Sequence, residues 1–317
     1  MGFTIYKLYH IMQNMSIKKQ GKIIIILGPT ASGKSDFAVK LAKKYNSEII
    51  SADSRQVYKK LDIGSNKITE EEKQGIKHYA LDIIEPDQSF SLHDWQTMTF
   101  ELIEKIQSHK KLPILVGGTG LYLSSILQNY QLPKTDLILR KELNQLSLKE
   151  LVDRLKKVDP EASKNINLKN KIHVVRALEY ATAWKENFKD AQKSSECPYQ
   201  HLIFGLSPER EILYKKINQR VDQMIDQGLV EEVKKIYKKY PDKTLSALSG
   251  IGYQEIIQYL EKKLTPEEAI DLIKKNTRHY AKRQMTWFRR MEKQGLEITW
   301  NKNIDQAIEI TQKFITK

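Results

Sequence analysis

Apolar and polar positions along the chain divide it into short runs typical of buried strands and longer stretches typical of amphipathic helices. The clearest strand is the run from Ile23 to Leu27, five consecutive apolar residues and therefore too few to cross a membrane. A helical stretch begins a few residues later, with Phe37, Val39 and Leu41 among its apolar positions. A strand, a turn and a helix in this order predict the start of an α/β domain.

The same two patterns continue along the chain. Strands are predicted within 47–56 and 112–120, and at 78–84, 201–206 and 297–300. Helices are predicted from 91, over 121–127, as one long helix from 208 to about 233, and from Thr265, a capping residue followed by Pro266, to about Lys293. Between 131 and 198 short helices rich in Lys, Glu and Leu replace the strands, which predicts a helical insertion in the α/β core.

The turn after the first strand carries the clearest chemical signal. Residues 28–35 read GPTASGKS and match the pattern G-x-x-x-x-G-K-[ST] of a phosphate-binding loop. Glycines allow backbone N–H groups to surround an anion, and the start of the next helix adds partial positive charge. Lys34 supplies a full charge, and the Ser35 hydroxyl can bind Mg²⁺. The strand before the motif and the helix after it favour a polyphosphate site over an ordinary glycine-containing turn.

Composition and charge limit the kind of binding partner and the cellular compartment. The chain has 317 residues, and its 53 Lys and Arg against 39 Asp and Glu give a net charge of +14, which suits a polyanionic partner without identifying it. Cys197 is the only cysteine, which excludes disulfide frameworks and cysteine-based zinc modules and favours the cytoplasm. No apolar stretch is long enough for a membrane helix, and residues 1–14, before Met15, are assigned no function.

Two polar residues outside the loop are candidates for the same site. Asp53 follows a predicted strand, and ligands of parallel sheets bind at the carboxyl ends of strands, so its carboxylate is expected near the phosphates as a metal ligand or general base. The alternative is an aspartate that caps the following turn. Arg220 could bind a diphosphate through its guanidinium, or could pair at the surface with Asp222 or Glu231.

The predicted helix near the C-terminus is strongly basic. From Leu272 to Met291 it has seven Lys and Arg residues and no acid. Solvated helix faces normally mix both signs, because like charges four residues apart repel each other. The charges therefore suit contact with phosphates, whereas Trp287 and Phe288 are expected to pack in the core rather than stack on bases.

Eight motifs stand along the chain in an order that is found together in one family. They read GPTASGKS (28–35), DSRQVY (53–58), DIG (62–64), PILVGGTGLYL (113–123), RALE (176–179), RVDQMIDQGLVEEV (220–233), GIGYQE (250–255) and TRHYAKRQMTWFRR (277–290). Over roughly residues 22–300 the chain resembles the tRNA dimethylallyltransferases, also called tRNA isopentenyltransferases. The resemblance implies a P-loop kinase-like α/β core with a mostly parallel sheet. It also implies transfer of the dimethylallyl group of dimethylallyl diphosphate to N6 of adenosine 37 of tRNA, with release of diphosphate.

The resemblance also implies roles for particular residues, with Mg²⁺ held at Ser35. Asp53 would accept the proton of the N6 amine, Thr119 would place the adenine, and Arg220 would assist diphosphate departure. The diphosphate would be bound by Gly28, Pro29, Thr30, Ala31, Ser32, Gly33, Lys34 and Ser35. Contacts to the tRNA anticodon stem-loop would come from Asp53, Ser54, Arg55, Gln56, Thr119, Arg176, Arg278, Lys282 and Arg283.

These inferences predict the organisation of the whole chain. We expect an N-terminal extension (1–21), a first part of the core (22–130), a tRNA-binding helical insertion (131–198) and a second part of the core with the basic helix (199–317). The expected protein is a cytoplasmic, monomeric enzyme without a membrane partner. Its sequence departs from the family at 64–67, which reads GSNK where G-T-A-K is usual, and at 170–173, where NKIH replaces an Arg-containing stretch.

Two other functions fit parts of the pattern. A small-molecule or nucleotide kinase would hold ATP in the same loop, and a non-enzymatic RNA-binding module would need neither the loop nor Asp53 for chemistry. An ATP-hydrolysing motor is disfavoured, because the strand within 112–120 ends in glycines and lacks the acid that such motors use to hold Mg²⁺ and water.

Overall fold

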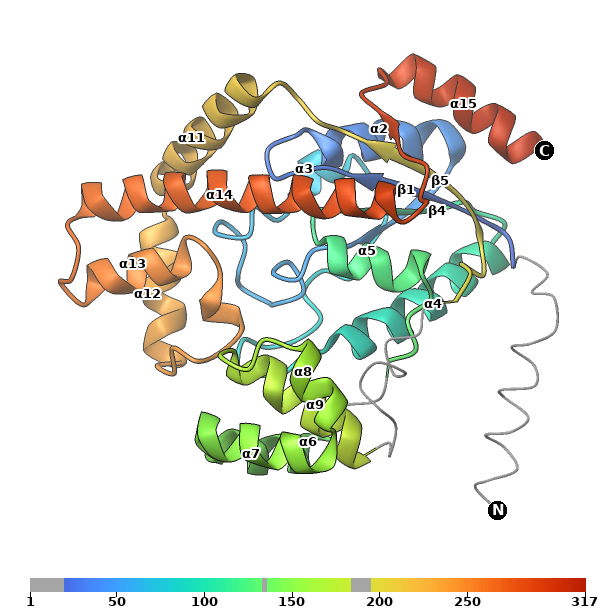
Figure 1. Cartoon of the computed structure of the whole chain (residues 1–317). Helices are drawn as coiled ribbons and strands as arrows, with labels where there is room; N and C mark the ends of the chain where they lie inside the picture. Colours follow the sequence, from blue (N-terminus) through green and yellow to red (C-terminus); the bar gives the residue numbers. More distant parts are fainter. Residues whose placement is uncertain (1–19, 133–135, 184–194) are drawn as a thin grey trace. The chain divides into compact units, whose positions relative to one another are not determined.

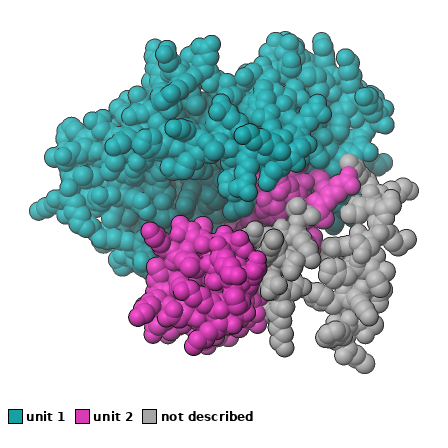
Figure 2. Space-filling model, in the orientation of Figure 1, with its two compact units in different colours: residues 1–89, 99–123, 198–317 teal, residues 90–98, 124–197 magenta. Residues whose placement is uncertain are grey.

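A computed structural model describes residues 20–132, 136–183 and 195–317 of the chain (Figure 1). The described residues form two compact units (Figure 2). Unit 1 takes its residues from 1–89, 99–123 and 198–317, and unit 2 from 90–98 and 124–197. The predictions for residues 1–14, and for most of the extension 1–21, lie outside the described residues.

Unit 1 is built on a six-stranded sheet with the order β3-β2-β4-β1-β5-β6. Every neighbouring pair of these strands is parallel, which confirms the predicted α/β class and its parallel sheet. The strands are β1 (Lys22–Leu27), β2 (Glu48–Ser51), β3 (His78–Tyr79), β4 (Pro113–Gly117), β5 (Gln200–Gly205) and β6 (Thr299–Trp300). The predicted strand 78–84 is wrong beyond Tyr79, because Ala80 and Asp82 adopt left-handed backbone angles, with φ of 63° and 53°.

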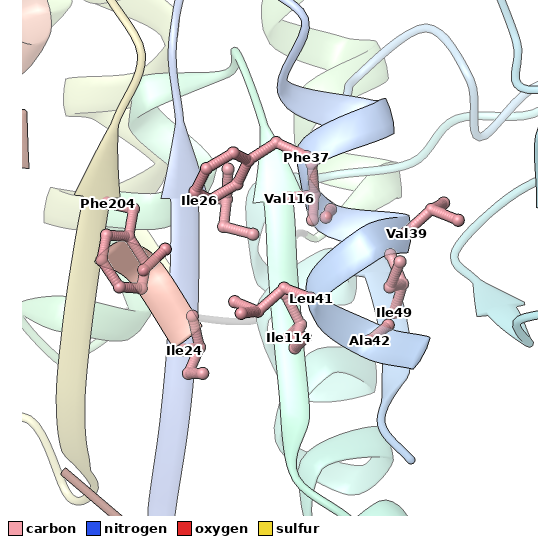
Figure 3. Close-up of a cluster of buried hydrophobic side chains, with 12 residues drawn as sticks. Ile24, Ile26, Phe37, Val39, Leu41, Ala42, Ile49, Ile114, Val116 and Phe204 are labelled. Carbon is pink, nitrogen blue, oxygen red and sulfur yellow. The ribbon is translucent and has the colours of Figure 1, made fainter. Parts of the chain in front are cut away.

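The central strand β1 is apolar along its length because both faces of the sheet are covered. All five residues from Ile23 to Leu27 have no exposed surface. On one face Ile24 and Ile26 contact apolar side chains of the first helix, α2 (Lys34–Tyr45), as Figure 3 shows. Phe37 of α2 packs edge-to-face on Phe204 of β5, with ring centroids 5.9 Å apart. This packing fixes the start of α2 against the carboxyl end of β1.

The remaining helices of unit 1 were predicted only in part, since those at 70–73, 253–260 and 304–316 have no counterpart among the predictions. They are α3 (Glu70–Lys73), the later part of α4 (Leu92–Ser108), the first part of α5 (Gly120–Leu127), α11 (Arg210–Asp226), α12 (Leu229–Lys239), a 3₁₀ turn (Ala247–Ser249), α13 (Tyr253–Leu260), α14 (Pro266–Lys293) and α15 (Ile304–Thr316). The single long helix predicted from 208 to about 233 is wrong. Gly228 has a φ of 98°, which ends α11 and starts α12 in a new direction.

The basic helix α14 begins where its capping signal predicted. The Thr265 hydroxyl accepts the Glu268 N–H, and the Glu268 side chain accepts the Thr265 N–H, which completes a capping box before Pro266. Phe288 is fully buried, as predicted, and Trp287 is half-buried. None of the helices in the described residues is long and apolar enough to span a bilayer.

Unit 2 consists of helices in its described residues. Besides parts of α4 and α5 it contains α6 (Leu137–Gln145), α7 (Leu148–Val158), α8 (Pro160–Asn165) and α9 (Lys171–Ala183). Its core is a separate apolar cluster that includes Leu143, Leu151, Leu155, Val174 and Leu178. The cluster shows how short helices with many charged residues hold together, since each contributes one apolar stripe.

Candidate active site

The phosphate loop turns sharply between β1 and α2. Ala31 and Gly33 have positive φ angles of 63° and 89°, so the loop bends back on itself before the helix starts. Gly33 is the N-cap of α2, and no side chain caps this helix end. The first backbone N–H groups of α2 therefore have no partner within the helix, which makes them donors for an anion.

A cavity of about 180 Å³ lies beside this loop and brings together residues far apart in sequence. Lys34 and Ser35 line it from the loop, Asp53 from the end of β2, and Arg220 from α11. Burial lowers the pKa of Lys34 from its usual 10.5 to about 8, a shift that the negative charge of Asp53 opposes and the positive charge of Arg220 increases. Three of the predicted reactive side chains thus act electrostatically on one another within a single cavity.

Asp53 caps the turn after β2 and also lines the cavity. Its Oδ1 accepts the backbone N–H of Arg55 at 2.8 Å, so the carboxylate does cap the turn after β2. The same side chain lines the cavity beside Lys34. One carboxylate oxygen is therefore held by the turn, and that bond fixes the orientation of the group that faces the cavity.

Thr119 is held against the turn that contains Asp53. Its backbone N–H donates to Ala52 O, and its hydroxyl accepts the N–H of Ser54, each at 3.2 Å. The adjacent Gly117 has to be a glycine, because a Cβ there would lie 2.1 Å from Ala52 O. The close approach of these two strand ends places the Thr119 side chain beside the turn after β2.

Arg220 does not make the surface ion pairs that were the alternative to a site role. Asp222 instead contacts Lys274 at 2.5 Å, and Arg220 lines the cavity, where Glu72 is the acid that acts on its charge. Burial lowers the pKa of Arg220, which shows that its guanidinium is partly removed from water. A partly desolvated cation beside a phosphate loop interacts strongly with an anion.

Several site residues escaped the sequence analysis. Burial, followed by the charge of Asp53, raises the pKa of Tyr280 to about 12, and the nearby Thr119 side chain opposes the shift. Gln284, one helical turn further on, contacts both the phosphate loop and the turn before Thr119. Both residues lie on the inner face of the basic helix, and only their spacing of four residues in α14 could have indicated that they share it.

The loop 62–67, where the sequence departs from its family, borders the cavity. Ser65 and Asn66 line the cavity, and the Gln56 side chain donates to the carbonyl oxygens of both at 3.4 and 3.1 Å. Lys67 is buried and contacts Asp62 and Asp82, each at 2.6 Å. The lysine therefore holds the loop, and the two residues before it face the cavity.

The predicted tRNA contacts fall into different environments. In unit 1, the Arg55 guanidinium donates to Ser246 O, and Arg278 donates to Asn218 Oδ1 at 2.6 Å. Lys282 and Arg283 are exposed on α14. Lys282 also lines a second cavity, of about 370 Å³, together with Arg210 and Arg289.

Arg176 lies in unit 2. Its guanidinium contacts Glu179 at 3.4 Å and lies 5.1 Å from the centre of the Tyr180 ring. Glu179 also receives Arg140 Nη2 at 2.7 Å, so Arg176 belongs to an ion-pair network within the helices of unit 2. Its assignment to tRNA binding stays a prediction.

The oxygen atoms around the cavity suit a hard cation. Ser35, Ser51, Asp53 and Glu72 line it, and hydroxyl and carboxylate oxygens are the ligand types that Mg²⁺ takes in proteins. Among the residues that the structure describes, no cluster of three His, Cys, Asp or Glu side chains could hold a metal by itself. Mg²⁺ commonly completes its coordination with water and phosphate oxygens.

Comparisons with known proteins agree with this geometry. Residues 56–291 match the family model described as IPP transferase. The tRNA dimethylallyltransferase of Halothermothrix orenii is 46% identical over 287 residues, covering 88% of this chain and 86% of that protein. This chain belongs to the IPP transferase family. The tRNA dimethylallyltransferase of Clostridioides difficile is 42% identical over 297 residues, covering 91% and 95% of the two chains.

Solved structures of this family share the fold. The tRNA isopentenylpyrophosphate transferase of Bacillus halodurans is 41% identical with a TM-score of 0.68, covering 93% of this chain and 95% of that one. A eukaryotic dimethylallyltransferase acting on tRNA is 27% identical with a TM-score of 0.80, covering 94% of this chain and 80% of that one. The family resemblance seen in the motifs is thus confirmed.

Proposed function

We propose that this protein transfers the dimethylallyl group of dimethylallyl diphosphate to N6 of adenosine 37 in tRNA and releases diphosphate. The observation that supports this most strongly is the single cavity in which the phosphate loop, Asp53 and Arg220 meet. The reaction needs a cationic cradle for a leaving group and a base for the nucleophile, and this cavity offers both.

The nucleophile needs help because the N6 lone pair of adenine is delocalised into the ring. In the proposed step N6 attacks C1 of the dimethylallyl group, and the C–N bond forms as the C–O bond to diphosphate breaks. The electron pair of that C–O bond leaves with the diphosphate. Asp53 accepts the N6 proton, and its bond to the Arg55 N–H holds the carboxylate in place for this transfer.

The leaving group gathers negative charge as it departs. Lys34 and Arg220 line the cavity from two sides, and the uncapped N-terminus of α2 faces the same space through Ser35. These groups are fixed by the fold before the reaction begins, so they stabilise the developing charge without reorganising. Mg²⁺, held by the Ser35 hydroxyl and the diphosphate oxygens, would add positive charge to the leaving group.

The tRNA would meet unit 1 along the basic helix α14. Lys282 and Arg283 are exposed there, and Tyr280 on the inner face of the same helix lies near Thr119. In this proposal the anticodon stem-loop is the part that is bound, since its target adenine has to leave its stack to reach Asp53. We propose that the protein acts as a monomer in the cytoplasm.

A transfer assay tests the proposal directly. The purified chain is incubated with Mg²⁺, dimethylallyl diphosphate labelled in the dimethylallyl group, and unmodified tRNA, and the labelled nucleotide is mapped by nuclease digestion and mass spectrometry. The proposal expects label on adenosine 37 and loss of transfer when EDTA removes the metal. Phosphorylation of a small molecule or nucleotide by ATP, without transfer from dimethylallyl diphosphate, would identify a kinase instead.

A further inference from the structure

Gln284 occupies an unusual position for a polar side chain on the basic helix. It is 6% exposed, although its neighbours Lys282 and Arg283 point to solvent. Its Oε1 accepts the backbone N–H of Thr30 in the phosphate loop at 2.9 Å. Its Nε2 donates to the backbone O of Gly118, in the turn before Thr119, also at 2.9 Å. One side chain therefore joins the two turns that carry the site.

The two bonds fix which end of the amide faces which turn. A backbone N–H can only donate and a carbonyl oxygen can only accept, so Oε1 has to face Thr30 and Nε2 has to face Gly118. Gly118 leaves room for this contact, because a Cβ there would lie 2.2 Å from the Gln284 Nε2. The lack of a side chain at Gly118 thus makes space for the Gln284 side chain.

Neighbouring residues of α14 extend the same contact surface. Tyr280, four residues before Gln284, lies close enough to Thr119 for that side chain to affect its pKa. Trp287, three residues after it, lies so close to Gly120 that a Cβ on that glycine would be 2.3 Å from the indole ring. Residues with this spacing share one face of a helix, so the inner face of α14 follows the turn 118–120 while its outer face carries the basic side chains.

The bond to Thr30 also decides which donors of the phosphate loop remain for a ligand. Because the Thr30 N–H is already used by Gln284, the diphosphate has to be bound by other groups, chiefly the first amides of α2 and Lys34. The bond between Gln284 and Thr30 holds the phosphate loop, and it therefore affects where those donors lie relative to Thr119 and Asp53. In the proposed reaction, these turns carry the groups that bind the leaving group and place the nucleophile.

We infer that Gln284 is a positioning residue that holds the phosphate loop and the Thr119 turn at the separation required for group transfer. This inference rests on the proposed prenyl transfer, since it concerns the geometry of that reaction. Displacing reacting groups by about 1 Å can cost roughly 10²-fold in rate. The side chain touches neither substrate, and its effect would appear in the chemical step.

The test compares two substitutions at this position with a control on the same helix. Gln284→Met keeps the length of the side chain and removes both hydrogen bonds. Gln284→Glu keeps the acceptor for Thr30 but places a negative charge against Gly118 O and near the diphosphate. Met291→Ala is the control, because Met291 is fully buried in α14 two helical turns beyond Gln284, and truncating its side chain weakens core packing.

We expect Gln284→Met to lower kcat by about 10- to 100-fold, while KM for tRNA changes by less than about 3-fold because the basic face is intact. Gln284→Glu should in addition weaken binding of inorganic pyrophosphate, measured by calorimetric titration. Met291→Ala should lower the melting temperature with kcat nearly unchanged. If Gln284→Met and Met291→Ala lose kcat only in proportion to folded protein, the residue is structural and the inference is wrong.

A second measurement does not depend on activity. Amide hydrogen exchange of the loop 28–35, followed by NMR, should show a protected Thr30 N–H in the native chain and fast exchange in Gln284→Met. Unchanged protection would contradict the bond between Gln284 and Thr30. If the native chain itself transfers no dimethylallyl group, the proposed function fails; if it is active and Gln284→Met is equally active, only the positioning role fails.

Discussion

Asp53 holds a turn of the fold and is also available for the proposed chemistry. The bond from the Arg55 N–H to its Oδ1 closes the turn after β2, and the same carboxylate faces the cavity beside Lys34. A turn-capping aspartate and a general base were opposite interpretations of the sequence, but geometry makes them compatible. A carboxylate has two oxygens, and the backbone needs only one of them.

Because the backbone uses only one carboxylate oxygen, Asp53→Asn gives a clear prediction. The amide oxygen can still accept the Arg55 N–H, so the turn should persist, but the group can no longer take up a proton. We expect the single-turnover transfer rate to fall by ~10²–10⁴-fold with tRNA affinity retained. Asp242→Asn is the matched control, because Asp242 Oδ1 accepts the Thr244 N–H in the same way at 2.8 Å and does not line the cavity. Similar rates for both variants would exclude Asp53 as the base.

Lys34 shows that burying a positive charge beside the phosphate loop makes the side chain easier to deprotonate. Its ammonium is crowded by the loop, donates to Pro29 O at 3.3 Å, and shares the cavity with the charged Arg220. Burial lowers its pKa to about 8, so a lysine that is fully charged in water is close to losing its proton in this site. A bound diphosphate would favour the charged form.

The lowered pKa of Lys34 predicts that pyrophosphate affinity depends on pH. Below about 8 the free side chain is protonated and binding takes up no proton; above it, binding has to protonate the lysine, so affinity falls as pH rises through 8. We expect a loss of up to roughly tenfold per pH unit between about pH 8 and 9 in calorimetric titrations. In Lys34→Met the affinity should be low and this decrease absent. An equal decrease in both proteins would assign it to another group.

At the scale of elements, the loop 62–64 is held by the helix α12. Glu232 accepts the backbone N–H groups of Asp62, Ile63 and Gly64 at 3.0, 2.8 and 3.0 Å, and the Tyr253 hydroxyl at 2.7 Å. Gly64 has to be a glycine here, because a Cβ would lie 2.5 Å from the Tyr253 ring. Three motifs that are far apart in the sequence thus form one contact that shapes the border of the cavity.

Glu232→Gln should loosen this contact. The amide has a single acceptor oxygen for four donors, and its own N–H₂ group would face two of them. We expect a loss of about 1–3 kcal/mol in the free energy of unfolding, measured by urea titration, because donors are left unsatisfied. Glu231→Gln, one residue earlier on the exposed side of α12, is the control and should change stability little. Equal stability of the two variants would show that water replaces the carboxylate at no cost.

Several elements could be predicted because their signals are local. The apolar run of β1, the phosphate loop and the capping box before Pro266 each lie within a few residues, and each appears where predicted. The break between α11 and α12 was missed, although Gly228, which adopts a positive φ, separates the two helices. The strand after His78 was overestimated, since its apolar pattern gave no sign of the positive φ at Ala80.

At the scale of the whole molecule, the site is built from segments that the sequence does not connect. Lys34, Asp53 and Arg220 were singled out one by one, and the structure brings them to one cavity. Gln284 and Glu232 carry no local signal, because a glutamine on a basic helix and a glutamate on a charged helix resemble surface residues. Their roles depend on tertiary contacts with the phosphate loop and with the loop 62–64. The pattern of residues within one helix does not reveal such contacts.

The net charge of +14 can attract tRNA only through Lys and Arg side chains that are not already paired with groups of the protein. Lys274 of α14 contacts Asp222 at 2.5 Å and Arg278 donates to Asn218, so these two are partly committed to the protein. Lys282 and Arg283 are exposed on the same helix, and neither side chain has an acid within contact distance among the ion pairs of the described residues. Exposed cations without an acid are those that can displace counterions from a nucleic acid.

We therefore predict that tRNA affinity falls steeply with salt and that Lys282 contributes to the slope. A side chain that neutralises one phosphate adds roughly 0.7–0.9 to the slope of log affinity against log salt, so Lys282→Ala should flatten it by about that amount. The measurement is filter binding of unmodified tRNA across a series of KCl concentrations. Lys40→Ala is the control, because Lys40 is also exposed but already contacts Asp36 at 2.8 Å. If Lys282→Ala weakens binding and leaves the slope unchanged, its contact is not to a phosphate, and the outer face of α14 does not bind tRNA by charge.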